Sequence, residues 1–583
     1  MIGRLFRLLV TAGALAIALP IWILLLLVAL GAGGGVGLFV FAMLRGLIEG
    51  GSEMRGEWPV TVLGWIGLAS VLLPVWALAV TFWAQYCGLS PLFIRLGRAS
   101  HGSARFSSKA ERAALARGDG LLIGRDADTG RLLRYDGPAH LITLAPTRAG
   151  KGVGTIIPNL LTANRSMLVI DPKGENARIT ARARQKFGSV HVLDPFGVTG
   201  LPAAAYNPLD RLTPDSPDLG EDAAALAEAL VMDPPGQVSE AHWNEEAKAL
   251  LSGLIMFVAC HETPERRSLA ALREYLTLPP ERFRELLELM QQSDAAYGLI
   301  ARAANRFLGK ADREAASVLS NAQRHTHFLD SPRITAAMGH SDLRFAGLRH
   351  EVTTIFLVLP PNRLDAYSRW LRLLVSEALQ DIARDAETLT NAQSASEPRR
   401  EAAPASAPLA SHNPETAVQR PTQRLCAPLP TPTLFLLDEF AALGRLEAVE
   451  RAMGLMAGYG IQLWPILQDM SQLKDLYGTR ASTFIANAGV QQVFGVNDLE
   501  TARWLSQSIG QETTAYRSVS QKPGELDSLT TSVTGRDLLT PDEIMQLPPE
   551  AQLLRIQSQP ITAARKLRYY ADPEFSGLFE PQP

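Results

Sequence analysis

Two long runs without a charged residue occupy most of the N-terminal part of the chain, at 8–44 and 58–94. Each run exceeds the roughly 20 residues that an α-helix needs to cross a bilayer. Neither run is long enough for two full spans and a turn. We therefore expect one transmembrane helix in each run, at 9–30 and 60–83, and a membrane anchor over residues 1–95.

Basic residues flank this anchor unevenly, which predicts its orientation. Arg4 and Arg7 precede the first run, and a larger basic group follows the second: Arg95, Arg98, Arg105, Lys109, Arg112 and Arg117. Because basic residues stay on the cytoplasmic side of a membrane, both termini and the domain that follows are expected in the cytoplasm, with a small loop on the other side. A cleaved signal peptide is the alternative reading of the first run, but its apolar core is too long for that role.

Beyond the anchor, short apolar runs typical of strands alternate with amphipathic segments typical of helices, over 96–214 and 346–583. This alternation predicts an α/β domain with a largely parallel sheet, whose functional groups lie at the carboxyl ends of the strands. The expected strands are 121–124, 132–135, 140–144, 166–171, 190–194, 352–359, 434–438, 461–467, 490–497, 551–557 and 566–570. The expected helices between them include 363–385, 446–456 and 498–509.

The pattern changes twice within this domain. Over 215–345 the strand-like runs disappear and helical periodicity takes over, which predicts an all-α insertion. Its expected helices are 221–232, 242–260, 269–276, 280–291 and 314–328. Residues 388–430 are rich in Ala, Pro, Ser, Thr and Gln, and this composition predicts a disordered loop between a helix and the next strand.

Composition limits the range of functions. The 583 residues are 47% hydrophobic and 20% charged, with a net charge of −3. No overall basic character draws the chain to nucleic acid, so any such contact must come from a local groove or pore. Cys87, Cys260 and Cys426 are scattered without the spacing of a metal site.

A phosphate-binding loop is the strongest chemical signal. Residues Ala145–Gly152 read A-P-T-R-A-G-K-G between the expected strand 140–144 and a helix-like segment at 153–157. In such a loop the backbone N–H groups surround an anion, and the lysine reaches the terminal phosphates of a nucleotide. The candidate nucleotide-binding residues are Pro146, Thr147, Arg148, Ala149, Gly150, Lys151 and Gly152.

Two positions depart from the usual form of this loop. Ala145 stands in place of the first glycine, and Gly152 stands where a Ser or Thr normally binds Mg²⁺. The sequence therefore does not identify which loop side chain, if any, would bind Mg²⁺. Thr155, one turn further along, is a poor candidate.

Two later strands supply the other half of a nucleotide site. The expected strand at 434–438 ends in two adjacent acids, which suits Mg²⁺ binding by Asp438 and polarisation of the attacking water by Glu439. The strand at 461–467 ends at Gln468, which is expected at the same sheet edge and can sense the γ-phosphate or orient water. The alternative interpretation is that both strands end in solvent-exposed turns, where the acids and the glutamine have no catalytic role. Together with the loop, these residues predict an ATPase that uses ATP and Mg²⁺.

Taken in order, these motifs resemble the type IV secretion coupling proteins, the TraG-type ATPases of bacterial conjugation. The resemblance covers almost the whole chain. It rests on the phosphate-binding loop, on Leu437-Asp-Glu-Phe-Ala441 and Gln468-Asp469, and on four further segments: His101-Gly-Ser-Ala-Arg105, Asp171-Pro-Lys-Gly-Glu175, Tyr206-Asn-Pro208 and Lys566-Leu-Arg-Tyr-Tyr570.

The resemblance implies a RecA-like P-loop motor domain with an inserted all-α domain for substrate recognition, preceded by two transmembrane helices. It implies a homo-hexamer at the inner membrane whose partners are a relaxase, single-stranded DNA and the components of a type IV secretion channel. It also implies catalytic roles for Lys151, Asp438, Glu439 and Gln468. One departure is that Met456–Gly460 lacks the arginine finger of some relatives; Arg451 and Arg480 are the nearby alternatives.

Other functions stay open on the sequence. The same motor could carry protein effectors, and toxin–immunity pairs rather than a relaxase in the neighbouring genes would favour that cargo. A catalytically weak membrane adaptor is a second alternative, against which the pair Lys151 and Asp438 argues. The family-specific segments argue against a DNA-pumping ATPase of cell division.

Overall fold

The computed structural model describes residues 101–232, 241–396, 427–520 and 528–581. Residues His101–Pro583 form one compact unit. Within the described ranges, no helix is both long and apolar enough to cross a membrane. The two transmembrane helices expected at 9–30 and 60–83 lie outside the described residues.

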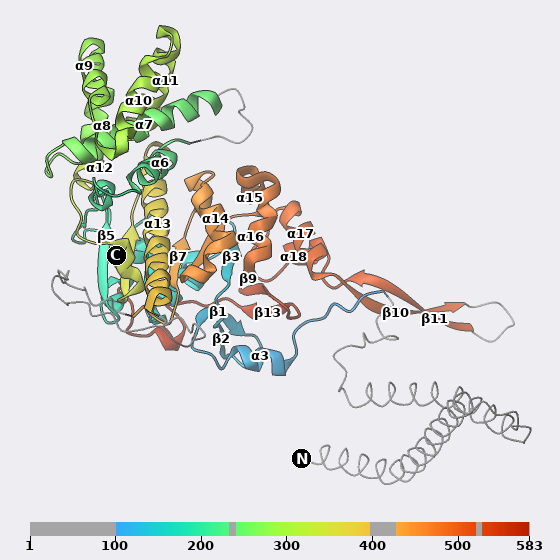
Figure 1. The fold of residues 1–583 in the computed structure, drawn as a ribbon. Helices are drawn as coiled ribbons and strands as arrows, with labels where there is room; N and C mark the ends of the chain where they lie inside the picture. The colour runs from blue at the N-terminus through green and yellow to red at the C-terminus, as the bar shows by residue number, and fades with distance from the viewer. Residues whose placement is uncertain (1–100, 233–240, 397–426, 521–527, 582–583) are drawn as a thin grey trace, which may run out of the picture. The chain divides into compact units, whose positions relative to one another are not determined.

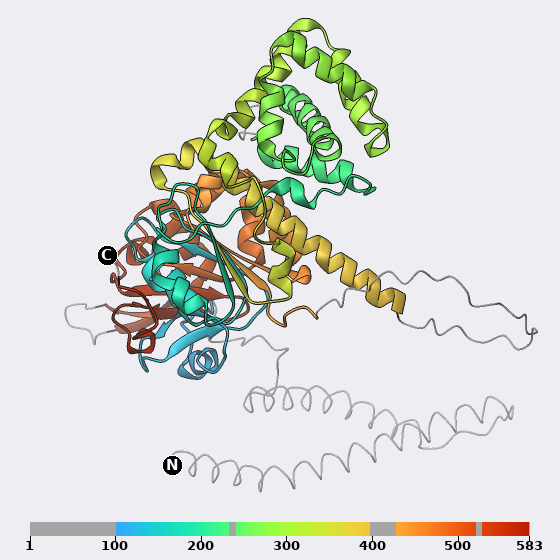
Figure 2. The same ribbon diagram turned by 90° about the vertical axis from the view of Figure 1, so that its left-hand side faces the viewer.

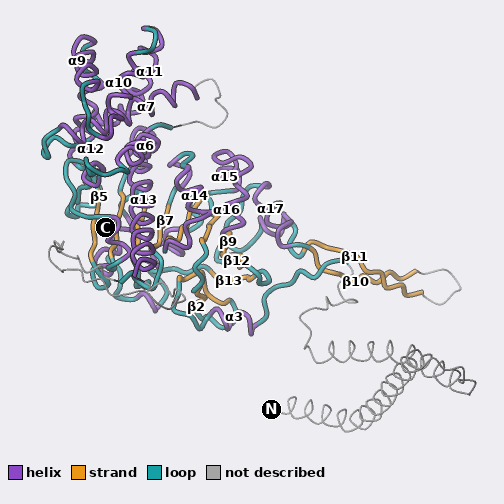
Figure 3. The backbone as a smooth tube through the Cα atoms, in the orientation of Figure 1, coloured by secondary structure: helices purple, strands orange, loops and turns teal. Residues whose placement is uncertain are grey.

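One large mixed sheet organises this unit (Figures 1 and 3). Its strand order is β2-β1-β13-β12-β9-β3-β8-β7-β4-β6-β5 in the part of the chain that the structure describes. The bounds are β1 Leu121–Asp126, β2 Leu132–Tyr135, β3 His140–Leu144, β4 Met167–Ile170, β5 Ser189–Leu193, β6 Thr353–Leu357, β7 Thr433–Leu437, β8 Ile461–Leu467, β9 Ala488–Val493, β12 Ala551–Ile556 and β13 Thr562–Arg565.

The seven strands from β9 to β5 are parallel, whereas β12, β13, β1 and β2 continue the sheet antiparallel. Leu144 is paired with Leu467, and Ile170 is paired with Leu437. The ends of β3, β8, β7 and β4 therefore meet at one edge of the sheet. The loops that follow these four strands carry the residues from which the sequence predicts a nucleotide site.

Helices cover both faces of the parallel part, which explains why its strands are apolar throughout rather than alternating. In β4, Leu168 and Ile170 face one core, and Met167 and Val169 face the other. The first core includes side chains of α13 (Leu364–Ser396), α14 (Glu447–Leu455) and α16 (Ala481–Asn487). The second includes side chains of the helical segment that begins at Gly152 and of α5 (Glu175–Arg184).

Helices alone fill the described chain between β5 and β6, as the periodicity over 215–345 predicts (Figure 2). Their bounds are α6 Leu219–Leu230, α7 Ala241–His261, α8 Leu269–Leu276, α9 Pro280–Gln291, α10 Leu299–Leu308, α11 Asp312–Thr326 and α12 Pro332–Ala336. The remaining helices are α3 Lys109–Leu115, α4 Ile157–Thr162, α15 Met470–Tyr477, α17 Leu499–Ile509 and α18 Pro541–Met545.

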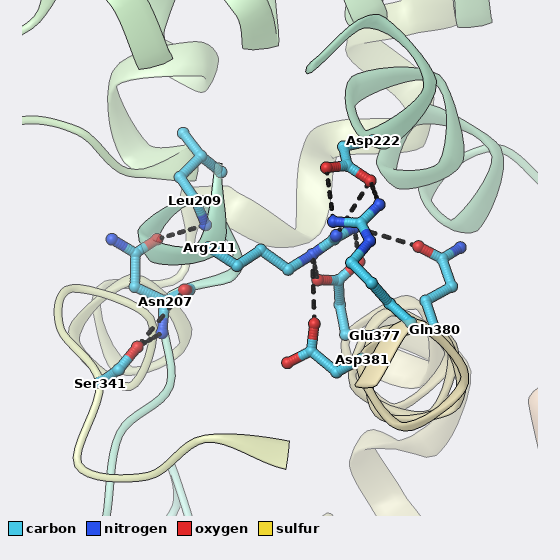
Figure 4. A network of polar contacts seen from close by, with 9 residues as sticks. Asn207, Leu209, Arg211, Asp222, Ser341, Glu377, Gln380 and Asp381 are labelled. Atoms are coloured by element: carbon cyan, nitrogen blue, oxygen red, sulfur yellow. Dashed lines mark hydrogen bonds and ion pairs between the residues drawn. The ribbon is translucent and has the colours of Figure 1, made fainter. Parts of the chain in front are cut away.

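A buried ionic cluster joins these helices to the sheet domain (Figure 4). Arg211, in the turn before α6, contacts Asp222 of α6 at 3.1 Å and also pairs with Glu377 of α13. Its Nη2 donates to Gln380 at 3.0 Å. Arg384 of α13 approaches Asp222 from the other side, with Nη1 donating at 2.8 Å. We call Arg211, Asp222, Glu377, Gln380, Asp381 and Arg384 the Arg211 cluster.

The structure differs from the sequence expectations in three places. Helix α13 continues to Ser396, so residues 388–396 of the expected disordered loop are helical. The expected strand at 566–570 is absent: β13 ends at Arg565, and Lys566–Tyr570 form a loop. A separate hairpin, β10 Gln511–Ser520 and β11 Ser528–Asp537, was not expected; few of its residues are apolar, so its sequence carries little strand periodicity.

Candidate nucleotide-binding site

The phosphate-binding loop connects β3 to a short π-helical segment at Gly152–Ile156, which continues as α4. Ala145, the buried residue directly after β3, donates its N–H to the carbonyl of Leu467 at 2.9 Å. A methyl group thus fits where the usual motif has glycine. Within the loop, Arg148 and Gly150 have φ values of +65° and +95°, which turn the backbone around a concave path. The value at Gly150 is one that an L side chain adopts only with strain.

Lys151 lies in a compact group of polar side chains that come from three strand ends. Its Nζ donates to Glu439 Oε1 at 2.5 Å and lies 3.2 Å from Asp438 Oδ1. Gln468 Nε2 donates to the other oxygen of Glu439 at 3.3 Å. The four residues predicted to be catalytic are therefore linked in one group of contacts, although Lys151 and Glu439 are 288 positions apart along the chain. We call them the Lys151 cluster.

Backbone strain accompanies this arrangement. Glu439 has the left-handed conformation, with φ of +49° and ψ of +43°, which is uncommon for a residue with a long side chain. Its N–H donates to Oδ1 of Asp438 at 3.0 Å. This turn lets two successive acidic side chains face the same lysine. Strained residues of this kind concentrate at functional sites.

Burial and charge shift the ionisation of the site. Burial raises the pKa of Asp438 although Lys151 opposes the shift. Burial lowers the pKa of Lys151, but Asp438 and Glu439 outweigh it, so the net shift is upward and the lysine stays charged. Burial also raises the pKa of Asp171, at the end of β4, to about 7, and the charge of Asp438 adds to this effect.

These residues border a cleft of about 630 Å³. Of the predicted loop residues, Thr147, Arg148, Gly150, Lys151 and Gly152 line it, as do Asp438, Glu439 and Gln468. Pro146 and Ala149 are on the other side of the loop and approach Gly495. Further lining residues, to which the sequence assigned no role, are Asp171, Pro172, Lys173, Glu175, Asn176, Pro361 and Leu364. In the sequence, only the family resemblance singled out the Asp171–Glu175 segment, and it assigned no role to these residues.

The donor set fits Mg²⁺ held in part by substrate oxygens and water. Asp438 supplies one carboxylate at the cleft, and Mg²⁺ is often bound through one or two carboxylates together with phosphates. A Cβ atom on Gly152 would meet no atom within 4 Å, which leaves open space where a loop hydroxyl usually stands. In the described chain no group of three or more His, Cys, Asp or Glu residues could hold a metal.

Three residues considered on the sequence are not in this cleft. The Thr155 hydroxyl is buried and donates to Gln492 Oε1 at 3.1 Å, which agrees with its being a poor metal ligand. Arg480 pairs with Glu450, and Arg451 lines a separate small pocket. Neither arginine borders the cleft.

Comparisons with known proteins agree with this geometry. The family described as type IV secretory system conjugative DNA transfer matches residues 105–394 and 417–581. A conjugal transfer protein TraG of Escherichia coli is 30% identical over 478 residues, which are 76% of this chain and 69% of that protein. The VirD4 protein of Rhizobium radiobacter is 26% identical and covers 76% of this chain and 59% of its own length.

Solved structures share the fold. The unbound conjugative coupling protein TrwBdeltaN70 superposes with a TM-score of 0.56 at 17% identity, covering 84% of this chain and 98% of its own. TrwB in complex with ADP and Mg²⁺ gives 0.55 at 18% identity, covering 82% and 96%. The mixed sheet and these neighbours fit the expected RecA-like fold. From the extent of the family match and the identity to TraG, this chain belongs to the type IV secretory system conjugative DNA transfer family, the coupling proteins.

Proposed function

We propose that this chain is an inner-membrane ATPase that recruits relaxase-bound single-stranded DNA and drives it to a type IV secretion channel by ATP hydrolysis. The observation that carries the proposal is the Lys151 cluster, in which the loop lysine, two acids and a glutamine meet over one cleft. TrwB has been solved with ADP and Mg²⁺ and with the ATP analogue ADPNP, which supports the same ligands for this cleft.

The site residues divide the work of hydrolysis in this proposal. Mg²⁺, held through Asp438, would neutralise charge on the phosphates. Lys151 exchanges its contacts with Glu439 for the phosphate oxygens, and this exchange leaves the Glu439 carboxylate free to accept a proton from water. Gln468, which contacts Glu439 at 3.3 Å, then orients that water or the carboxylate.

The assembly and the membrane anchor belong to the same proposal. We expect two transmembrane helices at 9–30 and 60–83, both termini in the cytoplasm, and a homo-hexameric ring. Because neither Arg451 nor Arg480 borders the described cleft, either of them would have to act on the nucleotide of a neighbouring subunit to stabilise the transition state. The all-α region over 215–345 is the proposed recognition element for the relaxase-bound DNA.

ATPase and transfer assays on the full chain test the proposal. Lys151→Ala should abolish ATP turnover and DNA transfer while the protein stays in the membrane fraction. Lys474→Ala is the matched control, because Lys474 is on α15, pairs with Glu500 and does not border the cleft. Wild-type turnover by Lys151→Ala would contradict the assignment of the site. If the wild-type chain hydrolyses ATP but transfers no DNA, and the same channel exports protein, the cargo would instead be protein effectors.

A further inference from the structure

The loop Lys566–Tyr570 packs directly behind the phosphate-binding loop. The carbonyl oxygen of Leu567 is 2.9 Å from the point that a Cβ on Gly154 would occupy, so a larger residue there would collide with this backbone. The N–H of Lys566 donates to the carbonyl of Glu550 at 2.8 Å, which ties the start of the loop to the sheet. The segment thus packs against the phosphate-binding loop and the helix that follows it, and it does not border the cleft.

Lys566 makes one specific polar contact from this position. Its Nζ donates to the carbonyl oxygen of Ala149 at 2.6 Å and lies 5.0 Å from the centroid of the Phe494 ring. A lysine over an aromatic face gains a cation–π attraction. Among the described residues, no carboxylate forms an ion pair with Lys566, and Lys566 does not border the cleft. The carbonyl of Ala149 is therefore the hydrogen-bond acceptor that the structure shows for the Lys566 ammonium group.

The contact determines the orientation of one peptide group. In a trans peptide the C=O and the following N–H point in opposite directions. When Lys566 holds the Ala149 carbonyl behind the loop, the N–H of Gly150 is turned to the cleft side, which Gly150 lines. In the described chain this N–H donates no hydrogen bond to a protein acceptor. Glycine rotates easily, so without the tether the peptide could turn its carbonyl toward the phosphates.

We propose that Lys566 is a positioning residue for nucleotide binding, which keeps the Ala149–Gly150 peptide oriented so that the Gly150 N–H donates to a phosphate oxygen of a nucleoside triphosphate. The inference rests on the proposed function, since it requires that the cleft take the phosphates of ATP. A preorganised N–H donor lowers the energetic cost of binding an anion, because the loop need not reorganise when the phosphates arrive.

Substitutions at Lys566 in the full chain test this role. Lys566→Met retains the length of the side chain but removes the donor, and should raise both the Kd for an ATP analogue and the KM for ATP about tenfold, with kcat changed by less. Lys566→Arg, which retains the charge and N–H donors, should restore most of the affinity. Lys566→Gln provides a second uncharged variant if the methionine form does not fold.

Arg568→Met is the matched control, because Arg568 is an exposed cation two residues along the same loop, outside the cleft. It should bind ATP with wild-type affinity. Wild-type Kd and KM in Lys566→Met, or a lower Tm with unchanged Kd, would overturn the positioning role while leaving the proposed ATPase intact. Failure of the wild-type chain to bind ATP, with Lys151→Ala indistinguishable from it, would overturn the proposed function itself.

Discussion

The Lys151 cluster and the Arg211 cluster are built from the same kinds of residue and behave differently. Each places a cation among carboxylates that are distant in sequence. In the Arg211 cluster the Glu377 side chain is 0% exposed, and Arg211 reaches it with a guanidinium that also contacts Asp222 and Gln380. In the Lys151 cluster the Glu439 side chain is 31% exposed and its backbone is strained.

This difference separates a structural role from a chemical one. A sealed ion pair cannot exchange partners without leaving a buried charge uncompensated, so it holds α6 and α13 together. An ion pair at the edge of a cleft can give up its contacts to an incoming anion. Burying charged groups costs free energy in both clusters, but only the Lys151 cluster borders a cleft where a ligand can reach it.

The largest effect on stability is expected from Arg211→Met. Removing Arg211 leaves the buried Glu377 without its cation and takes from Asp222 one of its two arginine partners, and the free energy of unfolding should fall by about 3–5 kcal/mol. The ATPase rate per folded molecule should change little at a permissive temperature. Denaturant unfolding of the full chain measures the first quantity. Arg384→Met, at a partly exposed arginine, should cost less; an equal loss would show that the cluster is not organised around Arg211.

Lys151→Ala should show the reverse pattern. Loss of the loop cation should lower ATP turnover by about a hundredfold or more, as removal of a preorganised charge-stabilising group does. The free energy of unfolding should change less than in Arg211→Met, because Asp438 and Glu439 border an open cleft where water can solvate them once the lysine is gone. Turnover and denaturant unfolding of the same preparation check both parts. A loss of stability as large as that of Arg211→Met would make the Lys151 cluster structural as well.

Glu439→Gln separates binding from hydrolysis within the Lys151 cluster. Glutamine retains the size of the side chain and a hydrogen-bonding oxygen but cannot act as a base, so ATP should bind and persist. Turnover should fall by about a hundredfold. If the chain forms the proposed ring and its subunits act in sequence, co-expression with the wild-type chain should block transfer. A recessive variant, or a normal rate of hydrolysis, would show that Glu439 is not the base or that the subunits act independently.

The smallest effect concerns pH. The pKa of Asp171 is raised by burial to about 7, above the ordinary value of 3.8 that applies to the unfolded chain. The folded state therefore favours the protonated form, and this contribution to stability is complete below pH 3.8 and is lost as pH rises to about 7. The slope should reach at most about 1.4 kcal/mol per pH unit.

Asp171→Asn removes this titration while keeping an oxygen for the N–H of Ala177, which donates to Asp171 at 2.8 Å. The free energy of unfolding of this variant, measured by denaturant at a series of pH values, should depend less on pH between about 5 and 7. An unchanged slope would show that another group titrates in this range.

Much of the site was evident from local patterns. The loop at 145–152 and the acids after β7 follow short apolar strands, and a strand that precedes a glycine-rich turn is recognisable from neighbouring residues alone. The parallel arrangement also followed from the alternation of strands and helices. Contact among Lys151, Glu439 and Gln468 was expected because parallel strands end at a common edge, and the register of β3, β7 and β8 brings them together.

What the local patterns could not indicate is which distant segments meet. Periodicity encodes the face that a residue presents, and it carries no information about the partner on the other side. Arg211 and Glu377, 166 positions apart, pair only because α6 and α13 pack together. Lys566 was assigned to a strand on the basis of its neighbours, yet strand pairing ends at Arg565 and the lysine turns to the carbonyl of Ala149. The residues at the strand ends could be identified from their neighbours in the sequence. The contacts of Arg211 and Lys566 depend on long-range packing, which exists only in the folded chain.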